Sequence, residues 1–327
     1  MIRAAGWIYG KVTDLRNALY DRGVLKSHSL GARTISVGNI TTGGTGKTPL
    51  VAYVAEILAE AGEKVCILTR GYGRQTSGRV LVSDGERVLV DARTGGDEPI
   101  ELAQKLIGKA IVVADADRVS AAAWAKEKFE VTTFVLDDAF QHRRAKRDLD
   151  IVCIDATNPF GNGRMLPAGR LREPLLNLAR ASAIVITRSD LPGDISELRS
   201  RAAALNPTAA IFLAVTRITN IEAIARNRAA FAFCGLANAD NFFELLRRNG
   251  IELKGTKSFP DHHYYTQEEI TDLERRAREA GAGVLLTTVK DIVKLADLRF
   301  DLPCQHVEIR TEVDKPEAFR RMITSFP

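Results

Sequence analysis

The sequence predicts an α/β protein: a P-loop NTPase-like, mostly parallel sheet with helices on both faces, plus a smaller C-terminal α/β lobe. Two observations lead to this prediction. Apolar, β-branched runs of strand length alternate with helical patterns from Arg33 onward, and the glycine-rich segment TTGGTGKT at 41–48 separates the first run from the first helical pattern. Near-continuous apolar strands with helices between them are typical of a parallel sheet covered on both faces.

The expected elements follow in order. Strands are predicted at 34–40, 64–70, 110–115, 132–138, 149–155 and 182–188, with a hairpin at 79–90 and helices at 49–62, 99–108 and 120–129. After residue 190 a second series begins, with strands at 211–215 and 229–235, helices at 239–249 and 266–281, and a last segment, VLLTTVKD, at 284–291. We therefore expect a core domain over 31–190 and a smaller lobe over 191–327 that closes over the active site. The last thirty residues carry no motif.

Length and composition fit this organisation. A chain of 327 residues is long enough for two domains, and 45% hydrophobic with 27% charged residues is typical of a globular protein. No apolar run reaches the roughly 18 residues of a membrane span, and no signal peptide is recognised. The cysteines form no CxxC pair, which favours reduced thiols over a disulfide frame or zinc site. A net charge of +5 points to a nucleotide, nucleic acid or anionic lipid as partner.

Residues 1–30 are predicted to be helical and amphipathic. Apolar and basic side chains recur there at helical spacing: Trp7, Ile8, Val12, Leu15, Leu19 and Tyr20, with Arg3, Lys11, Arg16 and Arg22. Two interpretations remain open. The helix packs on its own domain, or it lies in a membrane interface with its basic residues near anionic lipid.

The segment 41–48 resembles a phosphate-binding loop, although Thr41 stands where the first glycine is usual. Its glycines allow a tight turn that aims backbone N–H groups at phosphate oxygens, and the following helix presents its positive end to the anion. Lys47 can reach the β- and γ-phosphates, and the Thr48 hydroxyl can bind Mg²⁺. The expected nucleotide-binding residues are Thr41, Thr42, Gly43, Gly44, Thr45, Gly46, Lys47 and Thr48.

Further acids and histidines are candidates for chemistry. Asp137 and Asp138 end an apolar strand, where a Walker-B carboxylate belongs, although two acids could also form a solvated turn. Asp97 and Glu98 open a helix, either as capping residues or as groups that act on an attacking hydroxyl. His262, in the segment DHH at 261–263, belongs either to a structural turn or to a His–Asp pair that raises the basicity of a catalytic carboxylate.

Seven blocks, in order, resemble the tetraacyldisaccharide 4′-kinases of lipid A biosynthesis. They are SVGNITTGGTGKTP, RGYGR, GDEP, LDDAFQHRRAKRDLDIV, FGNGRMLPAGRLREP, FPDHHYYT and TTVKD, and they span residues 1 to about 295. The resemblance implies an ATP- and Mg²⁺-dependent kinase that phosphorylates the 4′-hydroxyl of tetraacyldisaccharide 1-phosphate to give lipid IV-A. It also implies a peripheral protein on the cytoplasmic face of the inner membrane, with no nucleic acid and no obligate protein partner. This family's loop also lacks the first glycine.

The same resemblance implies roles for individual residues. Asp97 is expected to be the general base, paired with His262, and Lys47 is expected to hold phosphates. Metal contacts are implied for Thr48, Glu98, Asp137 and Asp138. Substrate contacts are implied for Tyr72, Arg118, Gln141, His142 and Arg172.

Parts of the sequence also fit three other functions. The segment TRSD at 187–190 is similar to the base-reading motif of a GTPase switch, but Arg188 replaces its lysine. The basic run HRRAKR at 142–147 could belong to a nucleic-acid-binding ATPase, but it lacks interleaved aromatics for base stacking. A DHH-type phosphoesterase would need further metal-ligand clusters. Competition between GTP and ATP separates the switch from the kinase.

Overall fold

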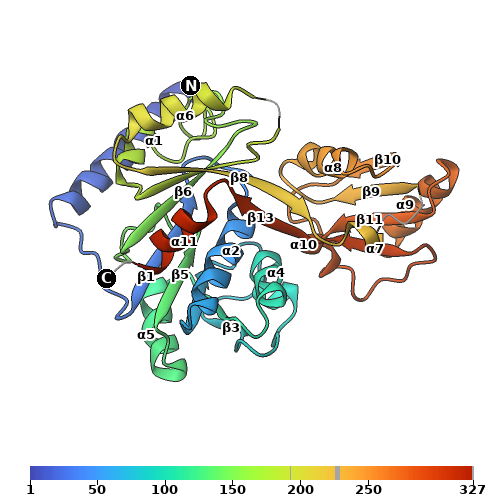
Figure 1. Cartoon of the computed structure of the whole chain (residues 1–327), viewed down its shortest axis with the longest axis horizontal. Coiled ribbons are helices and arrows are strands. Elements are labelled where there is room, and N and C mark those ends of the chain that lie inside the picture. The colour runs from blue at the N-terminus through green and yellow to red at the C-terminus, as the bar shows by residue number, and fades with distance from the viewer. Residues whose placement is uncertain (192, 225–228, 326–327) are drawn as a thin grey trace.

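A nine-stranded sheet and a four-stranded sheet organise the chain in a computed structural model that describes residues 1–191, 193–224 and 229–325. The molecule is elongated, with the large sheet at one end and the small sheet at the other (Figure 1). The large sheet has the order β13-β8-β7-β6-β1-β5-β2-β4-β3 and is parallel except at its two edges, where β13 and β3 run antiparallel to their neighbours. The predicted fold class is confirmed.

The strands of the large sheet are buried apolar segments. Along β5, Phe134 and Leu136 face one side and Val135 faces the other, so that both sides of the sheet are core. The strands are β1 Arg33–Asn39, β2 Val65–Thr69, β3 Val80–Ser83, β4 Ala110–Ala114, β5 Thr133–Asp137, β6 Leu149–Asp155, β7 Ala183–Thr187, β8 Ala210–Ile218 and β13 Ile309–Val313.

Helices cover both faces of this sheet. One face packs against α2 Lys47–Glu60, α4 Asp97–Lys105 and α11 Pro316–Thr324, and the short α3 Ala92–Gly95 precedes α4. The other face packs against α5 Arg118–Phe129, the 3₁₀ segment η1 Leu175–Arg180 and α6 Ile195–Leu205. The helix α1 Ile2–Asp21 lies outside this second layer, against the loop that precedes η1.

The small sheet has the order β10-β9-β11-β12, and all its strands are parallel. It has core on both faces as well: Phe242 and Leu246 of α8 pack on one, and Ile270 and Leu273 of α9 on the other. Its elements are α7 Ile221–Ile224, β9 Ala230–Cys234, α8 Ala239–Arg248, β10 Leu253–Ser258, α9 Gln267–Glu279, β11 Val284–Thr288, α10 Val289–Ile292 and β12 Cys304–Val307.

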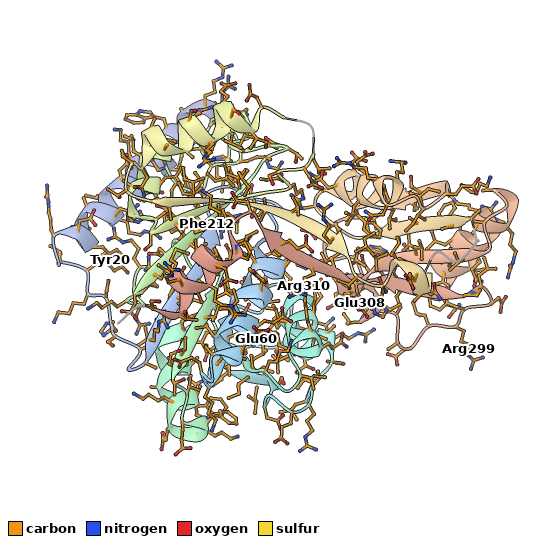
Figure 2. All side chains as sticks on the ribbon, in the orientation of Figure 1. Tyr20, Glu60, Phe212, Arg299, Glu308 and Arg310 are labelled. Carbon is orange, nitrogen blue, oxygen red and sulfur yellow. The ribbon has the colours of Figure 1, made fainter. Side chains whose placement is uncertain are left out.

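The structure differs from the expected division at residue 190. Strands β8 and β13 both belong to the large sheet, so the small lobe is inserted between them instead of following the core domain. The final helix α11 returns to the large sheet, where Phe319 lies 5.0 Å from Phe212 of β8 and 5.7 Å from Tyr53 of α2, between ring centroids. Figure 2 labels Phe212 next to this helix. The last residues therefore complete the core domain.

Two local expectations also change. The predicted helix at 1–30 ends at Asp21, and the chain then runs without helix to a single bridge between His28 and Ala145. The predicted hairpin at 79–90 keeps only its first strand, because β3 pairs with β4 and only one bridge, from Ser83 to Val88, links the second half.

Candidate active site

The glycine-rich loop joins the carboxyl end of β1 to the start of α2, as the sequence predicts. Gly43 and Gly46 have φ values of 108° and 77°, a backbone conformation that favours glycine. Thr41 is different: it is buried, makes a bridge with Leu171 and does not have a positive φ. The loop therefore needs no glycine at position 41.

Residues that the sequence analysis did not assign hold this loop in place. Asn39 Nδ2 donates to Thr45 Oγ1 at 2.9 Å, and Thr187 Oγ1 donates to the Thr45 carbonyl at 2.8 Å. Arg188 Nη1 donates to the Gly44 carbonyl at 2.8 Å and also pairs with Asp155. The TRSD segment, considered above as a base-reading motif, therefore supports the phosphate loop with its first two residues.

Asp138 is the centre of a charged cluster beside the loop. Arg172 donates two hydrogen bonds, of 2.6 and 3.0 Å, to its carboxylate, and Lys47 Nζ lies 3.7 Å from the same carboxylate. Burial opposes ionisation of Asp138, but Lys47 and then Arg172 outweigh it and lower its pKa to about 2. The carboxylate is thus charged, and it keeps both cations at the loop.

Asp137, at the end of β5, offers the clearest place for a cation. Thr69 donates to its Oδ2 at 3.0 Å, while the buried Oδ1 has no hydrogen-bond partner. Burial, with repulsion from Glu98 and Asp138, raises the pKa of Asp137 to about 7. An unpaired buried oxygen of this kind fits a hard cation such as Mg²⁺. No cluster of three or more His, Cys, Asp or Glu side chains in the described part of the chain forms a cage by itself, and Mg²⁺ at kinase sites relies largely on phosphate and water oxygens.

The Asp97–His262 pair joins the two lobes. Asp97 is the first residue of α4 in the large lobe, and His262 lies in the loop after β10 in the small lobe. His262 Nδ1 lies 2.9 Å from both carboxylate oxygens of Asp97. Burial acts to raise the pKa of Asp97, but the His262 hydrogen bond, Lys290 and Lys294 outweigh it and hold that pKa below its ordinary value. The predicted pairing of these two residues is present.

A cavity of about 660 Å³ lies between the lobes and receives these groups. Its lining includes the whole segment 41–48, both Asp137 and Asp138, and Glu98 and His262. Of the expected substrate-binding residues, Tyr72 and Arg172 line it, and the Tyr72 ring lies 5.1 Å from the His262 ring, centroid to centroid. A phosphate loop and a His–Asp pair therefore open into one space.

The other three expected substrate contacts lie behind the cavity wall instead of on it. Arg118 is buried, and its Nη2 lies 3.5 Å from the Asp137 carbonyl. Gln141 Nε2 donates to the Asn39 carbonyl at 2.9 Å, beneath the phosphate loop. His142 has a buried Nε2 without a hydrogen-bond partner. These three side chains therefore lie behind the residues that line the cavity and support the site from there.

His142 gives a testable dependence of stability on pH. Burial, and then the charges of Arg118 and Arg147, lower its pKa from 6.5 to about 4. Between these values the unfolded chain binds a proton that the folded chain does not, so stability falls as pH falls through this window. We expect the melting temperature of the wild type to drop more between about pH 7 and pH 5 than that of His142→Gln. Equal drops would contradict this, and the control is His306→Gln, at a histidine whose side chain is 40% exposed.

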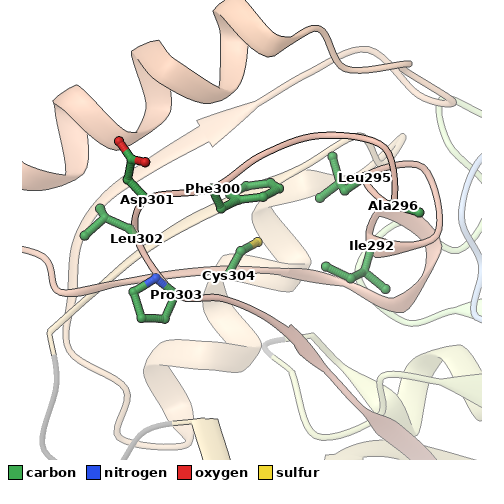
Figure 3. Close-up of a pocket in the computed structure, with 8 residues that line it drawn as sticks. All are labelled: Ile292, Leu295, Ala296, Phe300, Asp301, Leu302, Pro303 and Cys304. Atoms are coloured by element: carbon green, nitrogen blue, oxygen red, sulfur yellow. The ribbon is translucent and has the colours of Figure 1, made fainter.

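A second pocket, of about 440 Å³, lies in the small lobe beside α10 and the loop that leads to β12. Figure 3 shows its lining: Ile292, Leu295, Ala296, Phe300, Asp301, Leu302, Pro303 and Cys304. Apolar side chains dominate it and Asp301 is its one charged lining residue, so it lacks the phosphate loop and the cationic side chains that line the larger cavity.

The fold and the site together define a P-loop phosphotransferase. A family model described as LpxK, tetraacyldisaccharide-1-P 4′-kinase, matches residues 1–326. A tetraacyldisaccharide 4′-kinase of Desulfotalea psychrophila is 37% identical over 98% of this chain and 97% of its own length. One from Geobacter metallireducens is 42% identical over 88% of this chain and 86% of its own length. A solved structure of LpxK from Aquifex aeolicus in complex with ATP is 32% identical, with a TM-score of 0.78, and covers 100% of this chain and 99% of that one.

The chain belongs to the tetraacyldisaccharide 4′-kinase family. The identification made from the seven sequence blocks is confirmed.

Proposed function

We propose that this kinase transfers the γ-phosphate of ATP to the 4′-hydroxyl of tetraacyldisaccharide 1-phosphate and thereby forms lipid IV-A. The observation that carries the proposal is the shared cavity: the phosphate loop of the large lobe and His262 of the small lobe, which is paired with Asp97, line the same space. A phosphate donor held at one wall and a proton acceptor at the other are the two parts that phosphoryl transfer to a hydroxyl requires.

The loop and its neighbours form the donor side. Backbone N–H groups of 43–48 and the positive end of α2 bind the phosphates, and Lys47 reaches the transferred group. Thr48, Asp137 and Glu98 would hold Mg²⁺, which supplies positive charge against the phosphate oxygens when bound. Asp138 holds Lys47 and Arg172 beside the loop.

The acceptor side removes the proton from the sugar hydroxyl. Asp97 is only 3% exposed and His262 lines the cavity, so the pair acts as a unit with the imidazole nearer to the substrate. Tyr72, 65% exposed beside His262, offers its ring to the sugar. Since the acid and the imidazole come from different lobes, we also propose that the small lobe closes over bound substrates and completes this pair.

The direct test is the reaction itself. The purified chain is incubated with ATP, Mg²⁺ and radiolabelled tetraacyldisaccharide 1-phosphate, and a doubly phosphorylated lipid is the expected product. Rapid ATP hydrolysis without lipid, or preference for GTP over ATP in a binding competition, would instead support a nucleotide switch. If no doubly phosphorylated lipid formed under these conditions, the proposal would be refuted.

The helix α1 supports a peripheral location at the cytoplasmic face of the inner membrane. Its inner side is made of small and polar residues, Gly6, Gly10, Thr13 and Asn17, and its apolar residues point outward: Trp7 is 66% exposed and Leu15 is 62% exposed. No helix in the described residues is both long and apolar enough to cross a membrane. An outward apolar stripe flanked by basic residues fits an interfacial helix, each basic residue adding about 1 kcal/mol near an anionic surface.

The lipid acceptor argues for the same location. A disaccharide with four acyl chains remains in the bilayer, so the cavity has to be brought to its surface. Tyr20 is expected from the sequence to be one of the membrane-facing residues. Instead, the guanidinium carbon of Arg143 lies over the Tyr20 ring, 5.2 Å from the ring centroid. The proposed membrane face is therefore the first four turns of α1 and not its end.

Point substitutions test this better than deletion, because Asn17 Nδ2 donates to the buried Glu173 at 3.0 Å and deletion would break that bond. Replacing Trp7, Ile8 and Leu15 by serine removes about 1.5–3 kcal/mol of apolar burial for each, so binding to vesicles containing phosphatidylglycerol should fall at least tenfold. ATP binding should be unchanged. Ile107→Ser, an exposed apolar residue after α4, is the control. Unaltered co-sedimentation of the triple variant would rule out α1 as the membrane contact.

A further inference from the structure

A buried lysine stands behind the Asp97 carboxylate. The side chain of Lys294 is 0% exposed, and its Nζ lies 3.6 Å from Asp97 Oδ2 and 3.0 Å from Asp291 Oδ1. Unlike Lys290, it does not line the large cavity. Lys294 therefore has no access to the substrates and can act on them only through Asp97.

Asp291 fixes this lysine to the small lobe. Its Oδ1 accepts from Tyr265 Oη at 3.0 Å, and its Oδ2 accepts from Thr288 Oγ1 at 2.7 Å and from the Gly235 N–H at 3.1 Å. The Tyr265 ring centroid lies 5.7 Å from Lys294 Nζ. A carboxylate with this many donors cannot turn, so the ammonium group that it holds is fixed as well.

The segment that carries Lys294 is amphipathic. Lys290, Asp291 and Lys294 point into the charged cluster, while Ile292 and Leu295 line the apolar pocket on the other side (Figure 3). Because Ile292 and Leu295 pack on one side of this segment, its two lysines lie on the side that faces α4. Buried ion pairs add little net stability because desolvation cancels much of their attraction, so the chain Asp97–Lys294–Asp291 is better explained by a role in orientation.

We propose that Lys294, held by Asp291, is a positioning residue that fixes the Asp97 carboxylate beneath His262. Three groups of the small lobe then surround one carboxylate of the large lobe: His262 and Lys290, the latter 3.8 Å away, from the cavity side, and Lys294 from the core. This inference rests on the proposed function, since it assumes that the Asp97–His262 pair accepts the proton. Asp97 can hold its productive orientation only when the small lobe is docked on α4.

Lys294→Met and Lys294→Gln test the proposal. Both should lower kcat about 10²-fold, the cost of a catalytic group displaced by about 1 Å, while KM for ATP and the number of ATP molecules bound per chain stay at wild-type values. Lys254→Met, which breaks an exposed ion pair with Glu252 in the same lobe, is the matched control and should leave kcat unchanged. A kcat within about twofold of wild type in both variants overturns the proposal.

A double-mutant cycle separates positioning from folding. In an Asp97→Asn background, Lys294→Met should cause no further loss of rate, because its only route to the reaction is gone. A further loss of about 10²-fold in that background would overturn the proposal. Failure of both Lys294 variants to bind ATP would also overturn it, because Lys294 would then serve folding alone. If Asp97→Asn itself retains normal turnover, the proposed function fails first, and the two failures are thus distinguished.

Discussion

Replacing Asp97 by asparagine should lower kcat by about 10²–10⁴-fold, the usual contribution of a general base, and leave ATP affinity nearly intact. The substitution keeps the shape of the side chain but removes the charge that accepts the proton with His262. A base acts in the transition state, so the loss should appear in kcat and kcat/KM alike. Steady-state rates with the lipid acceptor, together with calorimetric titration of ATP, measure both quantities.

The control for this experiment is Asp84→Asn. Asp84 is an aspartate of the large lobe in the turn after β3, where its carboxylate accepts from the Glu86 and Arg87 N–H groups, and it does not line the large cavity. Near-normal turnover by Asp97→Asn would remove the assignment of the base, whatever the result at Lys294.

Replacing Lys47 by alanine should damage both ATP binding and transfer. Lys47 is the cation of the phosphate loop, and removal of one such preorganised donor typically costs about 10²–10³-fold in kcat. The loss should be accompanied by weaker ATP binding, in contrast to Asp97→Asn. Asp138 keeps its two hydrogen bonds from Arg172, so the fold should survive the change.

Lys64→Ala is the comparison for this variant. Lys64 lies between α2 and β2, at the opposite end of α2 from Lys47, and forms an exposed ion pair with Glu130 at 3.8 Å. A Lys47→Ala chain that bound ATP as tightly as wild type and phosphorylated the lipid at the wild-type rate would show that the loop has another role.

Local sequence predicted the phosphate loop well because all its determinants are contiguous: a buried strand, glycines at turning points and a helix. Even the threonine at 41 agrees, since that position bridges to Leu171 and needs no unusual backbone. The Asp97–His262 pair is different. The two residues are 165 positions apart, so no spacing rule connects them. At the level of sequence, only the resemblance to a family predicted that these two residues pair.

The sequence also misplaced the end of the core domain. Strand β13 carries alternating exposed polar residues, Arg310 and Glu312, and lies at a sheet edge, so it lacks the continuous apolar character of the inner strands. Lys294 was missed for a related reason. A lysine is ordinarily read as a surface residue, and its complete burial follows only from tertiary packing against Tyr265 and Asp97.

The insertion of the small lobe between β8 and β13 has a consequence for biosynthesis. A ribosome has to synthesise the entire insert before it makes the edge strand and the terminal helix that cover α2 and β8. Until then, Tyr53 and Phe212 of the nascent large sheet and its helix lack their aromatic partner Phe319. Truncation of the final segment would therefore destabilise the nucleotide-binding core domain, and not the small lobe that precedes this segment in the sequence.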